Sequence, residues 1–330
     1  MAGNGAGEGR PVAAFELTTS VSNLRHLRGS DLDPYDAVYL GNIHCRRYEG
    51  NLLERPDDLR TAVEMVRDQG KRAYVTTYAA PRAEALAAIM RAVEAGVGAG
   101  AAAVEVHAVG VLKLVRDAFP GTAVHAGSFA NVYTDLGAEV LRDRGVARIT
   151  PHHELPLDEV DRIARDVGVP MELTVHGKIP LGVSEVCFLL DYEAKWGVAC
   201  PDLCQKDVFL RKDDWGLKSV GKGILSGRDV CLLEHLGRLL EAGHRHFRIE
   251  TVSESPAYRL AIGTVYREAL ARRLEGDSAD EPRWWETVWA HTRLGLANGF
   301  YFGRSGMDYV GTARRPGPRQ DSRDSRRFRG

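Results

Sequence analysis

The hydrophobic positions of the chain follow two alternating patterns: short apolar runs and longer windows with helical spacing. In the windows, apolar residues recur every three or four positions, which is typical of a helix with one buried face. The short runs are rich in valine, alanine and isoleucine, and we interpret them as strands. The predicted strands are 13–18, 37–40, 73–77, 102–106, 122–125, 147–150, 171–175 and 246–250. The predicted helices include 57–69, 82–95, 109–118, 132–144, 157–167, 232–242 and 256–273.

Glycines mark the ends of several predicted helices. Gly70, Gly96, Gly145, Gly168 and Gly243 each precede the next strand or its lead-in, where glycine adopts the left-handed conformation of a helix C-cap at little steric cost. Strands that alternate with helices imply a parallel sheet. No Gly-x-Gly-x-x-Gly follows the first strand, which argues against a dinucleotide-binding sheet. Eight strand–helix units in one chain therefore predict an α/β fold of the TIM-like (β/α)8 barrel type.

One segment breaks the alternation of strands and helices. Residues 178–228 follow the seventh predicted strand, and we interpret them as a cysteine-rich insertion. Residues 13–311 would then form a single barrel domain that carries this insertion. The Gly-rich stretch 1–12 and the Arg-rich tail 312–330 are predicted to be disordered, and we interpret the tail as solvated rather than as an RNA-binding element.

Composition narrows the class of protein. The chain has 330 residues, 44% of them hydrophobic, and a formal net charge of −1, so its overall charge favours neither nucleic acid nor a membrane surface. Five cysteines, an odd number, argue against a secreted disulfide scaffold. The N-terminus lacks the apolar segment of a signal peptide, and no apolar run is long enough to span a membrane. We therefore expect a cytoplasmic protein with no membrane partner.

Three of the five cysteines lie in the predicted insertion. Cys187, Cys200 and Cys204 are separated by thirteen and four residues, a spacing that lets them reach one centre through a loop. Thiolates suit zinc, copper(I) or an iron–sulfur cluster, and the spacing matches neither zinc ribbons nor bacterial ferredoxins. A fourth thiolate could come from Cys45, at the end of the second strand, or from Cys231, which could equally be a buried apolar residue. The spacing thus indicates a soft-metal site without naming the metal.

Polar side chains stand at the carboxyl end of each predicted strand. In barrels the chemistry takes place at this end, where the strand–helix loops meet. Glu172, His176, His125 and Glu250 are the candidate catalytic residues, and they would line a polar pocket for a small anionic or hydroxylated ligand. Neither a Gly-x-Ser-x-Gly elbow nor a His-Glu-x-x-His helix is present, so two common hydrolase motifs are missing.

Several segments resemble one known family in the same order along the chain. They are DAVYLG, VHAGSFANVY, MELTVHG, VCFLLDYEAKWGVACPDLC, ILSGRDVCLLEHLGRLLEAGHRHFRIE, ESPAY and ANGFYFGRSG. Together they resemble the collagenase-like peptidase family U32 over residues 12–311. Within that family, the cysteine pattern is most similar to the UbiV type, which works with a paralogue in oxygen-independent ring hydroxylation for ubiquinone biosynthesis.

The resemblance implies a cofactor and a set of ligands. It makes Cys45, Cys187, Cys200 and Cys204 the ligands of a 4Fe–4S cluster and leaves Cys231 outside the set. It also implies a small-molecule or RNA-base substrate, prephenate as a possible oxygen donor, and a heterodimer with a paralogous family member. Pro180 or Leu181 stands where other members carry a ligand cysteine, so the ligand set of those members does not transfer whole.

Three functional hypotheses follow from the residues and the resemblance. The leading one is an iron–sulfur enzyme of oxygen-independent hydroxylation, as in anaerobic ubiquinone biosynthesis or the hydroxylation of tRNA or rRNA bases. The second is a metal-dependent peptidase of family U32. The third is a non-catalytic subunit that carries the cluster for a paralogous partner.

Overall fold

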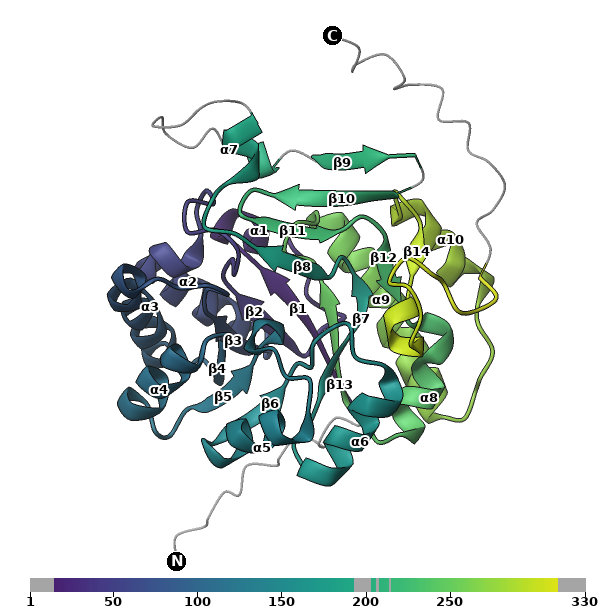
Figure 1. The fold of residues 1–330 in the computed structure, drawn as a ribbon, viewed down its shortest axis with the longest axis horizontal. Helices are drawn as coiled ribbons and strands as arrows, with labels where there is room; N and C mark the ends of the chain where they lie inside the picture. The colour runs from purple at the N-terminus through teal and green to yellow at the C-terminus, as the bar shows by residue number, and fades with distance from the viewer. Residues whose placement is uncertain (1–14, 193–202, 206–207, 214, 314–330) are drawn as a thin grey trace, which may run out of the picture.

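Parallel strands surround one axis, and helices cover their outer side (Figure 1). The structure is a computed structural model that describes residues 15–192, 203–205, 208–213 and 215–313. In these ranges the barrel wall has eight parallel strands: β1 (Glu16–Val21), β2 (Ala37–Leu40), β3 (Arg72–Thr76), β4 (Ala103–Val106), β5 (Ala123–Ala126), β6 (Val146–Ile149), β7 (Glu172–Gly177) and β13 (His246–Glu250).

The helices bury apolar faces against the outside of this wall. In α6 (Leu157–Val167) the buried residues are Leu157, Val160, Ile163 and Val167, which share one helical face, and the helix ends at Gly168 with φ 72°. The other α-helices are α1 (Leu24–Arg28), α2 (Pro56–Asp68), α3 (Leu86–Gly98), α4 (Val109–Ala118), α5 (Asp135–Asp143), α7 (Phe188–Tyr192), α8 (Leu236–Glu241), α9 (Pro256–Leu274) and α10 (Pro282–His291). No helix of the described chain is both long enough and apolar enough to cross a membrane.

The strands follow one another around the barrel in the order β7, β13, β1, β2, β3, β4, β5 and β6. Closure between β6 and β7 rests, in the described part of the chain, on one parallel bridge that pairs Ile149 with Met171. There the Ile149 amide donates to the carbonyl oxygen of Pro170 at 3.0 Å. The predicted α/β barrel is therefore confirmed, with one seam that is weakly paired through the backbone.

All eight predicted strands are present; β2 and β13 have the predicted bounds, and the ends of the other six differ from the prediction. The largest shift is in β1, predicted over 13–18 and found over Glu16–Val21. Polar residues continue this strand because they face the barrel interior, where the hydroxyls of Thr18 and Ser20 donate to carboxylates of other strands. Helix α8 is shorter than the predicted 232–242 because a 3-10 turn, Leu233–His235, precedes it.

A second sheet lies beside the carboxyl ends of the barrel strands (Figure 1). Its strands in the described ranges are antiparallel, in the order β8 (Pro180–Val183), β11 (Gly223–Ser226), β10 (Trp215–Val220) and β9 (Phe209–Lys212). The Lys218 ammonium of β10 reaches the carboxylate of Glu254, just beyond β13, at 3.0 Å. All four strands lie within the predicted insertion, whose apolar alternation is too short and irregular to predict strands.

Two short strands join the barrel near the insertion, and the chain ends are only partly described. β12 (Asp229–Cys231) pairs antiparallel with β7 and parallel with β14 (Leu296–Ala297).

The predicted disordered segments 1–12 and 312–330 lie outside the described residues, apart from Thr312 and Ala313. The amide of Thr312 donates to the carboxylate of Glu234 at 2.8 Å.

Candidate functional site

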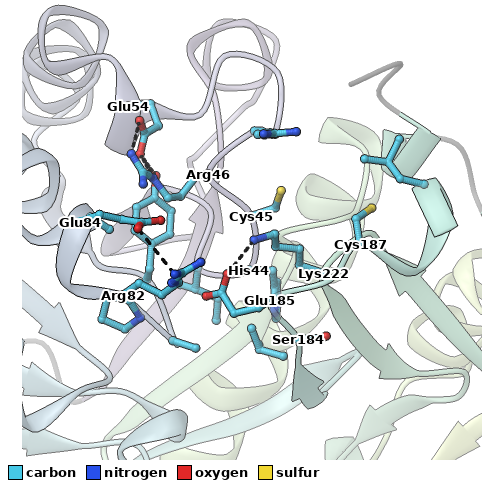
Figure 2. A pocket seen from close by; sticks show the side chains of 18 residues that line it. His44, Cys45, Arg46, Glu54, Arg82, Glu84, Ser184, Glu185, Cys187 and Lys222 are labelled. Atoms are coloured by element: carbon cyan, nitrogen blue, oxygen red, sulfur yellow. Dashed lines mark hydrogen bonds and ion pairs between the residues drawn. The ribbon is translucent and has the colours of Figure 1, made fainter. Parts of the chain in front are cut away.

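Two of the predicted ligand cysteines face one pocket at the carboxyl end of the barrel. Cys45, in the loop after β2, and Cys187, in the segment between β8 and α7, line a cavity of about 530 Å³. Figure 2 shows them on opposite walls with Lys222 between them. The charged residues around this cysteine pocket are Arg46, Arg47, Glu54, Arg82, Glu84, Glu185 and Lys222.

Cys204 lies close to Cys187, and Gly221, which has no side chain, lies beside both of them. A methyl group on the α-carbon of Gly221 would lie 3.5 Å from the sulfur of Cys187 and 4.0 Å from the sulfur of Cys204. Gly221 has φ 81°, a conformation that glycine adopts without strain. The turn between β10 and β11 thus leaves space under both thiols where any other residue would place a side chain.

A second pocket, of about 540 Å³, shares His44 with the cysteine pocket, and we call it the mouth pocket. Cys204 lines this mouth pocket together with groups near the amino end of α9, among them Glu254 and Tyr258. His44 lines both pockets; burial lowers its pKa to about 3, so its imidazole is neutral. The cationic or titratable nitrogen-bearing side chains of the mouth pocket are Arg25, His26, His44, Lys218 and His291.

Cys231 differs from the three cysteines that line the pockets. Cys231 is fully buried in the hydrophobic core, where the hydroxyl of Tyr266 lies 3.5 Å from its sulfur. Burial raises the pKa of this thiol to about 11, which disfavours a thiolate ligand. Cys200 lies outside the described residues.

The described donors suit a cluster better than a single ion. Within the described ranges, no three side chains of His, Cys, Asp or Glu converge closely enough to hold one metal ion. A 4Fe–4S cluster takes one thiolate on each of its irons, so its ligands surround a larger body. The thiols of Cys45 and Cys187 on two walls of a cavity, with Gly221 in place of a side chain beside Cys187 and Cys204, fit such a group.

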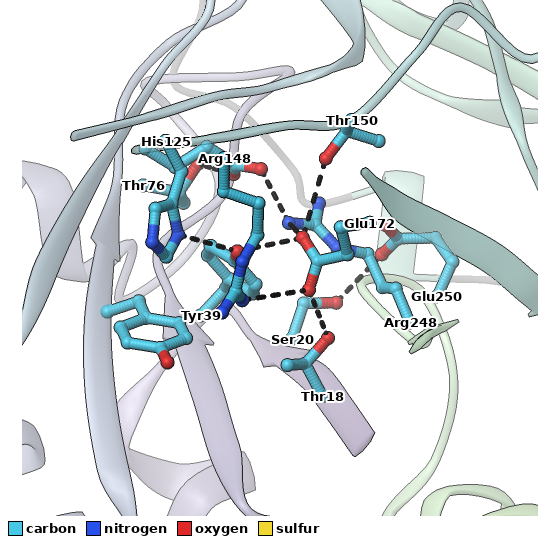
Figure 3. Close-up of polar contacts among 12 residues, drawn as sticks. Thr18, Ser20, Tyr39, Thr76, His125, Arg148, Thr150, Glu172, Arg248 and Glu250 are labelled. Carbon is cyan, nitrogen blue, oxygen red and sulfur yellow. Dashed lines mark hydrogen bonds and ion pairs between the residues drawn. The ribbon is translucent and has the colours of Figure 1, made fainter. Parts of the chain in front are cut away.

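Below the pockets, the interior of the barrel holds a buried network of charges (Figure 3). The carboxylate of Glu172 on β7 accepts from the guanidinium of Arg248 at 2.7 Å. It also accepts from the hydroxyls of Tyr39 and Thr18, both at 2.8 Å. Glu172 is therefore fixed by residues of three other strands.

Two further carboxylates complete the interior network. Glu105 on β4 accepts from Arg248 at 2.6 Å and from the hydroxyl of Thr76 at 2.6 Å. Glu16 on β1 accepts from Arg148 on β6, also at 2.6 Å. Arg148 and Arg248 thus pair with buried carboxylates from three strands.

The two arginines keep the central carboxylate ionised. Burial opposes ionisation of Glu172, but the guanidinium groups of Arg248 and Arg148 outweigh it and lower its pKa to about 2. The pKa of Glu105 is lowered in the same way: burial opposes ionisation, and Arg248 overrides it. A carboxylate with so low a pKa is a poor proton acceptor near neutral pH. Glu172 therefore holds the barrel interior together, and its catalytic role stays a prediction.

The same pKa predicts that the protein loses stability in acid. Glu172 has a pKa of about 2 when folded, whereas an unfolded glutamate has one near about 4.3. A lowered pKa stabilises the fold above the unfolded value, and this contribution disappears as the pH falls. We expect the free energy of unfolding to drop by about 3 kcal/mol between pH 5 and pH 2 from this group alone, as measured by urea titrations. A Glu172→Gln variant should show a flatter profile, and equal wild-type stability at both pH values would contradict the assignment.

His125 and Glu250 lie at the edges of this network. The Nδ1 atom of His125 is 2.9 Å from the hydroxyl of Tyr39. Because that hydroxyl gives its one proton to Glu172, His125 donates through Nδ1, and burial lowers its pKa to about 3. Glu250 accepts from the hydroxyl of Ser20 at 2.7 Å, and burial raises its pKa. The structure thus brings Glu172, His125 and Glu250 together, with Glu250 the candidate for proton transfer.

His176 points elsewhere, although its spacing from Glu172 predicts the same face of the strand. The pairing of β7 with β13 shifts between Thr174 and His176, so that His176 pairs with the outward-facing Ile249. This bulge turns the imidazole towards α9, where Nδ1 lies 3.1 Å from the hydroxyl of Tyr266. Burial lowers the pKa of His176 to about 3, and its Nε2 atom has no hydrogen-bond partner among the described residues.

Sequence reasoning missed the two arginines and Tyr39. Arg148 and Arg248 each stand between apolar residues of a strand, at positions whose alternation points into the barrel. A charged residue at such a position needs a buried partner of opposite charge. That requirement, applied to each strand in turn, could have predicted the network.

Comparison of the sequence with models of protein families identifies one family, peptidase family U32. The model of that family matches residues 32–310, so the chain belongs to it, as its motifs predict.

Relatives with curated names fall into two groups. The chain is 25% identical to a collagenase of Porphyromonas gingivalis, over 89% of this chain and 75% of the relative. It is 23% identical to tRNA hydroxylation protein P of Escherichia coli, over 87% of this chain and 73% of the relative. It is 26% identical to the 23S rRNA 5-hydroxycytidine C2501 synthase of the same organism, over 80% of this chain but 41% of that longer protein. The relatives are thus named for proteolysis and for RNA hydroxylation.

Proposed function

We propose that the protein takes part in an oxygen-independent hydroxylation and holds a 4Fe–4S cluster on Cys45, Cys187, Cys200 and Cys204. One observation carries the proposal: Cys45 from the barrel and Cys187 from the insertion face the same cavity, and Cys204 approaches Cys187 across the bare Gly221. The names of the two RNA-modifying relatives support a hydroxylation. The cluster, when bound, would supply one-electron chemistry.

The chain's own residues would bind and orient the reactants in the mouth pocket. Arg25 lines this pocket, as does Lys218, whose ammonium is paired with Glu254. Together with the histidines of the pocket they could hold a carboxylate, and prephenate is the oxygen donor we propose. The neutral imidazole of His44 separates the donor from the cysteine pocket. Glu250, whose pKa is raised by burial, is the group best able to hold a proton at the barrel mouth.

Anaerobic purification tests the cofactor, and a strain without the gene tests the reaction class. We expect a brown protein that contains iron and acid-labile sulfide. A strain that lacks the gene should lose one hydroxylated product, and mass spectrometry of its tRNA, rRNA and quinones would identify whether the substrate is an RNA base or a small molecule. A colourless zinc protein that cleaves gelatin would overturn the proposal in favour of a U32 peptidase.

The same purification tests the proposed partner. A paralogous family member is expected to copurify as a heterodimer. If hydroxylation in vitro requires that paralogue while the cluster stays on this chain, the protein is the cluster-bearing subunit. Hydroxylation by the isolated chain would assign the catalysis to it alone.

A further inference from the structure

Two buried asparagine side chains fix the backbone around Cys45. The side-chain oxygen of Asn42 accepts hydrogen bonds from the amides of His44 at 2.9 Å and of Cys45 at 3.2 Å. The side-chain nitrogen of Asn51 donates to the carbonyl oxygen of Cys45 at 3.0 Å. Both backbone polar groups of Cys45 are therefore held by side chains from the two ends of one loop.

Asn51 is itself held at every polar atom. Its oxygen accepts from the amides of Asn42 and Leu53, both at 3.1 Å, which ties the two asparagines together. Its nitrogen also donates to the hydroxyl of Tyr78 at 3.2 Å. Asn42 and Asn51 are both almost completely buried, so water cannot replace these bonds without rearrangement of the loop.

A salt bridge extends this support to the residue after the cysteine. The hydroxyl of Tyr78 donates to the carboxylate of Glu54 at 2.8 Å, and Glu54 accepts from the guanidinium of Arg46 at 2.8 Å. Gly50 turns the chain with φ 65°, so close to Asn23 that a methyl group there would lie 3.3 Å from the Asn23 β-carbon. The loop from Asn42 to Glu54 is thus closed by side-chain bonds around Cys45.

We infer that Asn42 and Asn51 are positioning residues that present Cys45 as the fixed ligand of the metal centre. The inference rests on the proposed function. Cys45 is anchored to the barrel and buried, whereas Cys187 and Cys204 belong to the insertion and are only partly buried. A ligand held in place before binding loses less freedom on coordination, and partners of this kind typically change metal affinity by about 10- to 100-fold.

The positioning role is tested with Asn→Asp variants, in which an oxygen replaces the nitrogen of the side-chain amide. Asn51→Asp keeps the size of the side chain but removes the donor to Cys45 and places an oxygen against the Cys45 carbonyl. Asn42→Asp keeps the accepting oxygen, so its effect should be smaller. Asn131→Asp is the matched control, because Asn131 is exposed and aspartate tolerates its left-handed backbone conformation.

Two readouts are needed, one with metal and one without. In anaerobically reconstituted protein, Asn51→Asp should lose iron to a chelator about 10- to 100-fold faster than wild type and Asn131→Asp. In metal-free protein, peptide-resolved mass spectrometry should show faster reaction of Cys45 with iodoacetamide in Asn51→Asp, with Cys187 unchanged. If Asn51→Asp does not fold, Tyr78→Phe, which removes one partner of Asn51, should show the same changes at smaller size.

The outcomes separate this inference from the proposed function. Wild-type protein that takes up no iron would reject the cluster, and the alkylation of Cys45 would then decide the positioning role by itself. Protein that takes up iron, but retains it equally in Asn51→Asp and Asn131→Asp, would overturn the positioning role and leave the cluster standing.

Discussion

Replacing Arg248 with methionine is expected to destabilise the protein by about 3–5 kcal/mol, the usual cost of breaking a buried ion pair from one side. The Arg248 guanidinium donates to Glu105 and Glu172, both fully enclosed in the barrel. Methionine fills similar volume but leaves two carboxylates without their shared cation. Protonation of either carboxylate would then become favourable, so the loss should be smaller at pH 4 than at pH 7.

Urea unfolding followed by circular dichroism measures this effect. Arg72→Met is the matched control, because Arg72 also pairs with a barrel carboxylate, that of Glu16, but its side chain is 50% exposed. Because water reaches the Arg72 guanidinium and Arg148 still pairs with Glu16, this variant should lose much less stability than Arg248→Met. An Arg248→Met variant with wild-type stability would show that the interior carboxylates are neutral or solvated, which would contradict their ion pairs with Arg248.

Replacing any one of Cys45, Cys187, Cys200 or Cys204 with serine should strip most of the iron from anaerobically purified protein. A 4Fe–4S cluster normally uses four thiolates, and serine is a poor substitute for a soft ligand. Iron and sulfide analysis, together with the visible spectrum, measures the loss.

Cys231→Ser provides the control for these variants. The Cys231 thiol has a raised pKa and lies in the core beside Tyr266, so this variant should keep its iron even if it is slightly less stable. Loss of the cluster in Cys231→Ser with retention in Cys45→Ser would reverse the ligand assignment.

The barrel could be predicted because short runs rich in apolar residues alternate with windows of helical spacing along the chain. Helices α4 and α6 have the predicted bounds, 109–118 and 157–167, since their apolar residues repeat with helical spacing. The shared pocket of Cys45 and Cys187 also follows from topology, because the loops after parallel strands meet at one end of a barrel.

Other features depend on contacts that spacing does not encode. A strand period of two predicts that Glu172 and His176 face the same side, but the bulge in β7 reverses the second of them. The role of Glu172 depends on Arg248, which lies 76 residues away in sequence. The second sheet escaped prediction because its strands are short and carry partly exposed residues on both faces.

Between β6 and β7 the barrel is held together mainly by side chains and only weakly by the backbone. Only the Ile149–Met171 bridge joins the two strands through the backbone in the described chain, while Arg148 and Thr150 of one side reach Glu172 of the other, at 3.7 Å and 3.4 Å. Side-chain contacts to Glu172, rather than a series of backbone hydrogen bonds, therefore close the barrel between β6 and β7. Local opening of the barrel should begin between β6 and β7. Backbone amide protons of these two strands should therefore exchange with solvent before those of any other pair of neighbouring barrel strands.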